Sequence, residues 1–177
     1  NVSGCTEIKG ELPVHLLKLL LDGKAKFDGC GKGAFTLPPE FGTIIEDRTK
    51  IDLSSLGKAL PSVPALCDVS VFEQANNLEE FNVSGCTEIK GELPVHLLKV
   101  ILDGKAKFDG CGKGAFTLPT SLGDAASTIR KVDLSSLGKA LTGSVSVFEQ
   151  ANNLEEFNAS GCTEIKGELP VHLLKLF

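Results

Sequence analysis

The stretch NVSGCTEIKGELPVHLLK, residues 1–18, occurs three times in this sequence and determines how the rest is interpreted. It returns unchanged from Asn82 and, with one substitution, as NASGCTEIKGELPVHLLK from Asn158. The copies begin 81 and 76 residues apart in a chain of 177 residues. Self-similarity at such spacings is typical of proteins built from stacked supersecondary units, so we interpret the sequence as a tandem array.

Each long repeat divides into three units, a, b and c, of about 25 residues. The head of a unit has apolar residues at its first, fourth and sixth places, as in Leu78, Phe81 and Val83, and Cys86 follows at the ninth. The same pattern recurs in the next heads as Ala106, Phe108 and Cys111, as Ile129, Val132, Leu134 and Leu137, and as Leu154, Phe157, Ala159 and Cys162. The extra residues of the first long repeat are most simply placed within residues 61–68.

The head motif and the residues after it, Ile89, Gly91, Leu93 and Pro94, resemble the plant-type leucine-rich repeat. The resemblance covers residues 1–177 as a single solenoid fragment of about seven units. The first and last units are incomplete, and no capping unit is visible in the sequence. The resemblance implies an α/β solenoid, a right-handed leucine-rich-repeat coil with a concave parallel β-sheet and with short helices or irregular turns on the convex side.

One unit cannot enclose its own apolar residues, so stacking must bury them. We expect one shared core lined by Val2, Phe27, Leu53, Val83, Phe108, Leu134 and Ala159. Residues 94–104 predict a short helix, with proline at the start and Gly104 after the end. Residues 147–153 predict one or two helical turns, residues 120–128 an irregular segment, and the insertion at 61–68 a bulge on the outer side.

Five of the six cysteines hold the ninth place of a head: Cys5, Cys30, Cys86, Cys111 and Cys162. The family resemblance implies that this place is buried and satisfies backbone groups of the turn, which favours unoxidised thiols. A disulfide between Cys86 and Cys111 stays open as an alternative, as does zinc, although the chain has no C-x-x-C and its histidines lie on the expected helices. Cys67 belongs to the insertion and is expected to be exposed.

Composition and motifs exclude several classes of function. Hydrophobic residues make up 42% of the chain and charged residues 23%, and the net charge of −5 disfavours nucleic acid as a partner. No apolar run reaches the length of a membrane span, since Lys18 interrupts the longest. The glycine-rich residues 109–117 lack the Gly-Lys-Ser/Thr of a phosphate loop, and no catalytic constellation recurs. We therefore predict no enzymatic activity, no cofactor and no metal site.

The resemblance implies that a protein partner binds the concave face. Strand alternation places these outward side chains on it: Glu80, Asn82, Ser84, Lys105, Lys107, Asp109, Lys131, Asp133, Ser135, Glu156 and Asn158. Adjacent units should set Glu80 beside Lys105 and Lys107 beside Asp133, so these charges could simply stabilise the ladder. The face has no aromatic anchor, because the chain has no Tyr and no Trp.

Asn1, Asn82 and Asn158 each begin an Asn-x-Ser sequon and are possible glycosylation sites in a secreted chain. The alternative is that asparagine only fills an outward strand position. The sequence does not distinguish an extracellular from an intracellular location.

Three hypotheses of function remain. The chain is a non-enzymatic protein-binding or scaffold module that presents its concave sheet to a partner, as the family resemblance favours. Alternatively it is a structural or adhesive repeat array, which the near-identity of the copies favours because a specific site needs units that differ. A third hypothesis is an accessory subunit of a larger assembly.

Overall fold

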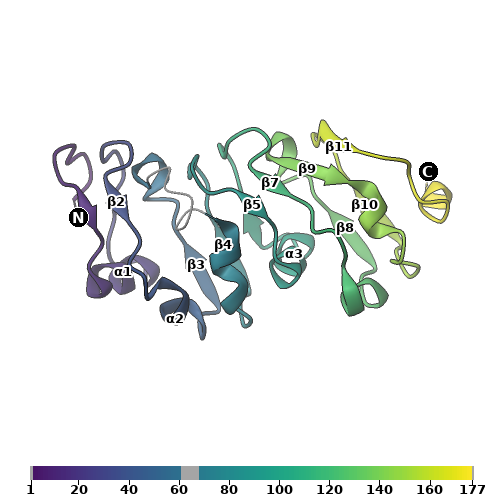
Figure 1. Cartoon of the computed structure of the whole chain (residues 1–177), viewed down its shortest axis with the longest axis horizontal. Coiled ribbons are helices and arrows are strands. Elements are labelled where there is room, and N and C mark those ends of the chain that lie inside the picture. The colour runs from purple at the N-terminus through teal and green to yellow at the C-terminus, as the bar shows by residue number, and fades with distance from the viewer. Residues whose placement is uncertain (1, 61–67, 177) are drawn as a thin grey trace.

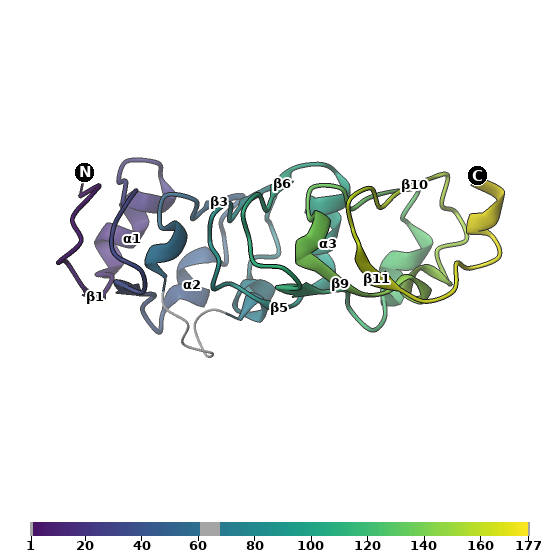
Figure 2. The same ribbon diagram turned by 90° about the horizontal axis from the view of Figure 1, so that it is seen from above.

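A computed structural model describes residues 2–60 and 68–176 of the chain. The polypeptide advances along one long axis, and its two termini lie at opposite ends of the molecule (Figure 1). Strands and helices are short, and the longest helices, α1 and α3, have eight residues each. Viewed from above, successive turns of the chain follow one another along the same axis (Figure 2).

The elements recur in a fixed order. The first long repeat contains β1 (Gly10–Glu11), α1 (Val14–Leu21), β2 (Phe35–Thr36), α2 (Phe41–Ile45), β3 (Lys50–Asp52) and the 3-10 helices η1 (Gly57–Ala59) and η2 (Val69–Gln74). The second contains β4 (Glu80–Asn82), β5 (Gly91–Glu92), α3 (Val95–Leu102), β6 (Ala106–Lys107), β7 (Phe116–Thr117), η3 (Gly123–Ser127), β8 (Lys131–Asp133), η4 (Gly138–Ala140), β9 (Leu141–Ser144) and η5 (Val145–Phe148). The last copy contains β10 (Glu156–Asn158), β11 (Glu164–Lys166) and η6 (Leu173–Leu176).

The strands form two sets of parallel ladders. Strands at the unit heads, which we call the first strands, pair in the order β3-β4-β6 and, separately, β8-β10. Strands further along each unit, the second strands, pair as β1-β2 and as β5-β7-β9-β11. The register matches equivalent residues of neighbouring units, for example Ile51 with Phe81 and Phe81 with Ala106. Neighbouring units therefore lie side by side, as strands of like position must to share a parallel ladder.

The ladder of first strands has an interruption. It ends at β6 and resumes at β8, so units b and c of the second long repeat are not paired at their heads. The second strands of the same two units are paired, because β7 hydrogen-bonds to β9. Helix α3 packs against both β6 and β8 at the interruption. The two units are thus hydrogen-bonded through their second strands and unpaired at their first strands.

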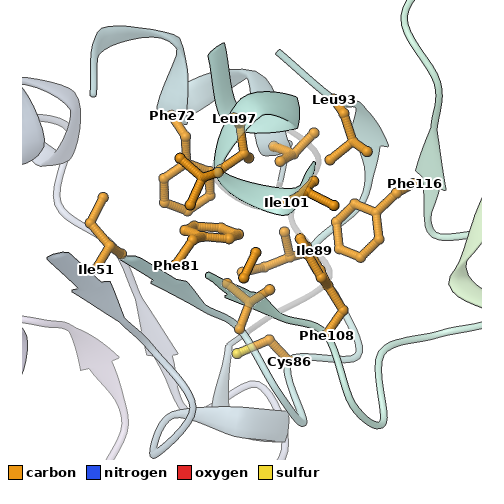
Figure 3. Close-up of a cluster of buried hydrophobic side chains, with 14 of the residues drawn as sticks. Ile51, Phe72, Phe81, Cys86, Ile89, Leu93, Leu97, Ile101, Phe108 and Phe116 are labelled. Atoms are coloured by element: carbon orange, nitrogen blue, oxygen red, sulfur yellow. The ribbon is translucent and has the colours of Figure 1, made fainter. Parts of the chain in front are cut away.

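The apolar residues of the heads form the core between these ladders. Leu53, Val83, Phe108 and Leu134 are almost completely buried, as the sequence predicted, and Phe27 is buried as well. Val2 and Ala159, near the two ends, are only partly buried. One cluster of buried side chains includes residues from every long repeat. In its centre Phe72, Phe81, Phe108 and Phe116 stand against one another, with Cys86 beneath them (Figure 3).

The predicted helix at 94–104 is confirmed as α3. Pro94 precedes it with a φ of −57°, and the Leu98 amide donates to the Pro94 carbonyl. Leu97, Leu98 and Ile101 face the core together. The helix ends at Leu102, and Gly104 follows with a positive φ of 70° while its amide donates to the Ile101 carbonyl.

A glycine opens the second strand of the first two a units, Gly10 in β1 and Gly91 in β5. Gly91 has a φ of 127°, which side-chain-bearing residues rarely adopt, and a Cβ atom there would lie 2.7 Å from Asp68 Oδ1. Gly143, the third residue of β9, has a φ of 126° and a Cβ position 2.9 Å from Leu118 Cβ. At Gly91 and Gly143 the backbone thus approaches its neighbour too closely for a side chain, whereas a Cβ atom at Gly10 would meet nothing within 4 Å.

Two local predictions need correction or restriction. Residues 120–128 were expected to be irregular, but Gly123–Ser127 form the 3-10 helix η3, because Ala126 turns into the core and Ser127 Oγ bonds back to the Asp124 carbonyl. The helical turn expected at 147–153 begins two residues earlier, as η5. The predicted bulge at 61–68 and the exposure of Cys67 lie outside the described residues, apart from Asp68, which caps η2.

Candidate functional site

The predicted binding face lies along the first strands. Seven of its eleven residues are in β4, β6, β8 or β10, and none of the eleven is buried: Glu80, Asn82, Ser84, Lys105, Lys107, Asp109, Lys131, Asp133, Ser135, Glu156 and Asn158. Of the remaining four, Lys105 directly precedes β6, and the others lie two residues after the end of a strand: Ser84, Asp109 and Ser135. The residues belong to two separate ladders, because the pairing stops between β6 and β8. The set is therefore accessible as predicted but is not one continuous sheet.

The register of β4 and β6 sets Glu80 beside Lys105, as predicted, but the ion pairs that connect the first strands are different ones. Glu80 Oε2 lies 2.7 Å from Lys50 Nζ on β3, and no ion pair links Glu80 to Lys105 within the described chain. An equivalent pair of 2.6 Å joins Lys131 to Glu156. The Lys50 hydrogen bond lowers the pKa of Glu80, and that bond in turn raises the pKa of Lys50. Each glutamate thus binds the lysine of the unit before it.

The predicted pair between Lys107 and Asp133 is wrong. Its premise was that β6 and β8 are neighbouring strands, and the ladder is interrupted there. Asp133 instead accepts hydrogen bonds from the amide and hydroxyl of Ser135, at 3.0 and 2.6 Å, which lower its pKa. The carboxylate of Asp133 therefore serves the turn after its own strand.

The sequon asparagines that the structure describes hold neighbouring units together. Asn82 Nδ2 donates to Asp52 Oδ2 at 3.1 Å, and Asn82 Oδ1 accepts from the Ser84 amide. Asn158 repeats this arrangement, with Nδ2 donating to Asp133 Oδ1 at 3.2 Å. The nitrogen that would carry a glycan is the donor in both bonds, so the geometry favours the structural interpretation of these sequons. Asn1 lies outside the described residues.

The ninth-place cysteines form a hydrogen-bonded row. Cys30, Cys86, Cys111 and Cys162 each direct Sγ to the carbonyl of the sixth-place residue one unit earlier, at 3.2–3.4 Å. No disulfide joins the row's cysteines to one another. Burial raises the pKa of Cys111 to about 11, and burial also raises that of Cys162. These thiols are poor nucleophiles, because the thiolate is the reactive form.

The lysines of unit b differ from the other outward charges. Neither Lys105 nor Lys107 forms an ion pair with any residue in the described part of the chain, whereas Lys50 and Lys131 do. Both line a shallow hollow of about 240 Å³ with Glu79 and Glu80. Glu80 feels the charge of both lysines, which helps to lower its pKa, but its close ion pair is with Lys50, so Lys105 and Lys107 have no direct ion pair within the described chain.

Within residues 2–60 and 68–176, no cluster of three or more His, Cys, Asp or Glu side chains has the arrangement of a metal site. None of the helices described has both the length and the apolarity that a membrane crossing requires. Comparison with protein-family models, curated proteins and solved structures found no match to this chain.

Sequence reasoning missed two functional features. One is the ion pair of Arg48 with Asp22, which joins units b and c of the first long repeat at 2.5 Å. The other is the role of unit c in the first repeat, where Lys50 and Asp52 provide the partners of Glu80 and Asn82. The near-identity of residues 51–55 and 132–136 was the available signal, since it places Lys50 and Asp52 where Lys131 and Asp133 were predicted.

Proposed function

We propose that this chain is a leucine-rich-repeat solenoid and serves as a non-enzymatic protein-binding or scaffold module. The partner binds the face formed by the first strands, which the family resemblance implies is concave. In-register pairing of units about 25 residues apart, with like residues opposite one another, supports the coil. The accessibility of the outward row supports its use as a surface.

The observation that carries the proposal is the unpaired state of Lys105 and Lys107. Both lysines are exposed, and they stand at the edge of a ladder in which Lys50 and Glu80 form an ion pair with each other. Desolvating a charge is unfavourable unless an opposite charge meets it, so a partner for this surface should present carboxylates there. Such contacts set specificity and the rate of association more than the affinity.

A structural or adhesive array is the second candidate, and one observation favours it. Residues 82–99 repeat residues 1–18 without change, so most outward positions are the same in each copy. A rod needs such uniform units, whereas a specific site needs differences. The accessory-subunit hypothesis has no comparable support.

Affinity capture with the full chain, followed by cross-linking and mass spectrometry, distinguishes these candidates. The binding module should capture a stoichiometric partner that cross-links to Lys105 or Lys107. Substituting both, Lys105→Glu with Lys107→Glu, should abolish capture, whereas Lys139→Glu on an exposed turn should not. Capture that survives the double substitution would refute this site, and self-association without any partner would favour the array.

A further inference from the structure

Two equivalent clefts lie where unit b meets unit c. The first, about 850 Å³, is lined by residues that include Asp22, Arg48 and Lys50. The second, about 580 Å³, lies between α3 and β8 and is lined by residues that include Asp103 and Ile129. Positions in the two clefts correspond at a shift of 81 residues, so the chain contains two versions of one site. Both volumes are in the range of ordinary ligand-binding clefts.

An arginine of the chain itself bridges the first cleft. Arg48 Nη1 donates to Asp22 Oδ1 at 2.5 Å, and this bond lowers the pKa of Asp22. The Arg48 side chain is only 27% exposed, so its stem is largely covered as well. The first version of the site therefore shows which group fits it: a guanidinium on the carboxylate, with the methylenes packed against the wall.

The second cleft keeps the acceptor and lacks the donor. Asp103 corresponds to Asp22 and ends α3, while Ile129 occupies the position of Arg48. Ile129 is partly buried against the core and carries no polar group. The Asp103 side chain is exposed and forms no hydrogen bond or ion pair with the residues that the structure describes. The second cleft thus keeps a carboxylate at the place where Asp22 binds Arg48, and the chain provides no guanidinium for it.

The lining of the second cleft suits a cation with an apolar stem. Leu98, Leu102 and Leu122 form apolar parts of its wall. Two of its cationic side chains are already neutralised, because Arg130 forms a 2.6 Å ion pair with Glu155 and Lys131 forms one with Glu156. The cleft is left with the carboxylates of Asp103 and Asp133 against the single unpaired cation of Lys99.

We propose that the cleft between α3 and β8 binds an arginine side chain of the partner protein, with the guanidinium on Asp103 and the stem against Leu98, Leu102 and Ile129. The proposal rests on the proposed function, since it assigns one contact of that partner. The cleft adds a site beside the first-strand face. It takes a cationic group of the partner, whereas Lys105 and Lys107 take anionic groups. Arginine is favoured over lysine because its planar fork can bond a carboxylate through two N–H groups.

The test is a titration of the full chain with acetyl-leucyl-arginyl-leucinamide and with its citrulline analogue, which has the same shape but no charge. Binding is followed by the backbone amide signals of Asp103, Gly104 and Ile129 in ¹H–¹⁵N NMR spectra. We expect saturable shifts at these signals with the arginine peptide and roughly threefold to tenfold weaker binding of the citrulline peptide.

Three variants complete the test. Asp103→Asn should lower the affinity for the arginine peptide to that for the citrulline peptide, whereas the matched control Asp22→Asn should leave it unchanged. Ile129→Arg should supply the missing side chain in cis and abolish binding. Because Asp103 is exposed, Asp103→Asn should fold normally and keep the proposal testable even if Ile129→Arg does not fold.

Equal affinities for the two peptides, or no shift at Asp103, would overturn the arginine site. Either result would leave the proposed function standing, because that is tested separately through capture and the Lys105→Glu with Lys107→Glu variant. Loss of capture with that variant, together with intact peptide binding at Asp103, would support both proposals.

Discussion

Truncation of one leucine in its three copies tests whether neighbouring units bury one another. Leu17, Leu98 and Leu174 occupy the same place in the repeated sequence. Leu17 is 0% exposed and Leu98 1%, and both belong to the buried core cluster. Leu174 is 56% exposed. The local sequence is the same, so any difference in stability between the substitutions must come from packing.

The magnitude follows from burial. Replacing leucine by alanine removes hydrocarbon groups whose full burial contributes roughly 0.8 kcal/mol each. The cavity left behind adds to this loss, so we expect the free energy of unfolding to fall by about 3–4 kcal/mol at Leu17 or Leu98. At Leu174 more than half of the side chain is already in water, so we expect about 1 kcal/mol or less. For a chain of this size, the larger loss corresponds to a fall in Tm of roughly 6–16 °C.

The assay is urea unfolding followed by circular dichroism, with thermal unfolding as a second measure. Repeat proteins do not always unfold in one step, so coincidence of two spectroscopic probes is the control for a single free energy. Equal losses in all three variants would refute the reasoning, because they would show that the burial of these leucines does not depend on neighbouring units.

Three further predictions follow from single residues. Asn82→Ala should cost about 1–2 kcal/mol of unfolding free energy, since it removes bonds to the preceding unit and to its own turn. Asn77→Ala on the surface should be nearly neutral, and a urea titration measures both. The thiol of Cys111, with a pKa of about 11 in the folded chain, should react with a disulfide reagent at pH 8 only after unfolding, and fast reaction of the native chain would contradict this. Its contribution to the free energy of unfolding should be lost as the pH rises from about 9 to 11. Gly143→Ala should lower Tm by several degrees, whereas Gly10→Ala, at a similar φ of 129° but with open space around it, should lower it less; thermal unfolding measures both.

The sign of the Cys111 effect follows from linkage. Burial raises its pKa from the ordinary 9.0, so the unfolded chain loses this proton at a lower pH than the folded chain does. Below pH 9 both states hold the proton, and the stabilisation is complete. Above it, ionisation of the unfolded state makes unfolding progressively easier.

The sequence predicted those features that depend on periodicity alone. The burial of Val83, Phe108 and Leu134 follows from apolar residues recurring at one place of each unit, and α3 from its flanking proline and glycine. The outward row could be identified in the same way, since side chains alternate along a strand.

Features that depend on pairing across units could not be derived so easily. A period states which residues are equivalent, but not that the ladder stops between β6 and β8, and the predicted contact of Lys107 with Asp133 failed for that reason. The bridge of Arg48 to Asp22 spans 26 residues and involves a segment that differs between the copies, so repetition gave no signal for it.

The central claim is that successive units lie side by side in parallel register, and backbone NMR contacts test it most directly. The account predicts cross-strand amide and α-proton contacts between Ile51 and Phe81, between Phe81 and Ala106, and between Val132 and Phe157, as expected for parallel strands about 4.8 Å apart. Contacts in an antiparallel pattern within one long repeat, with none between these pairs, would contradict it.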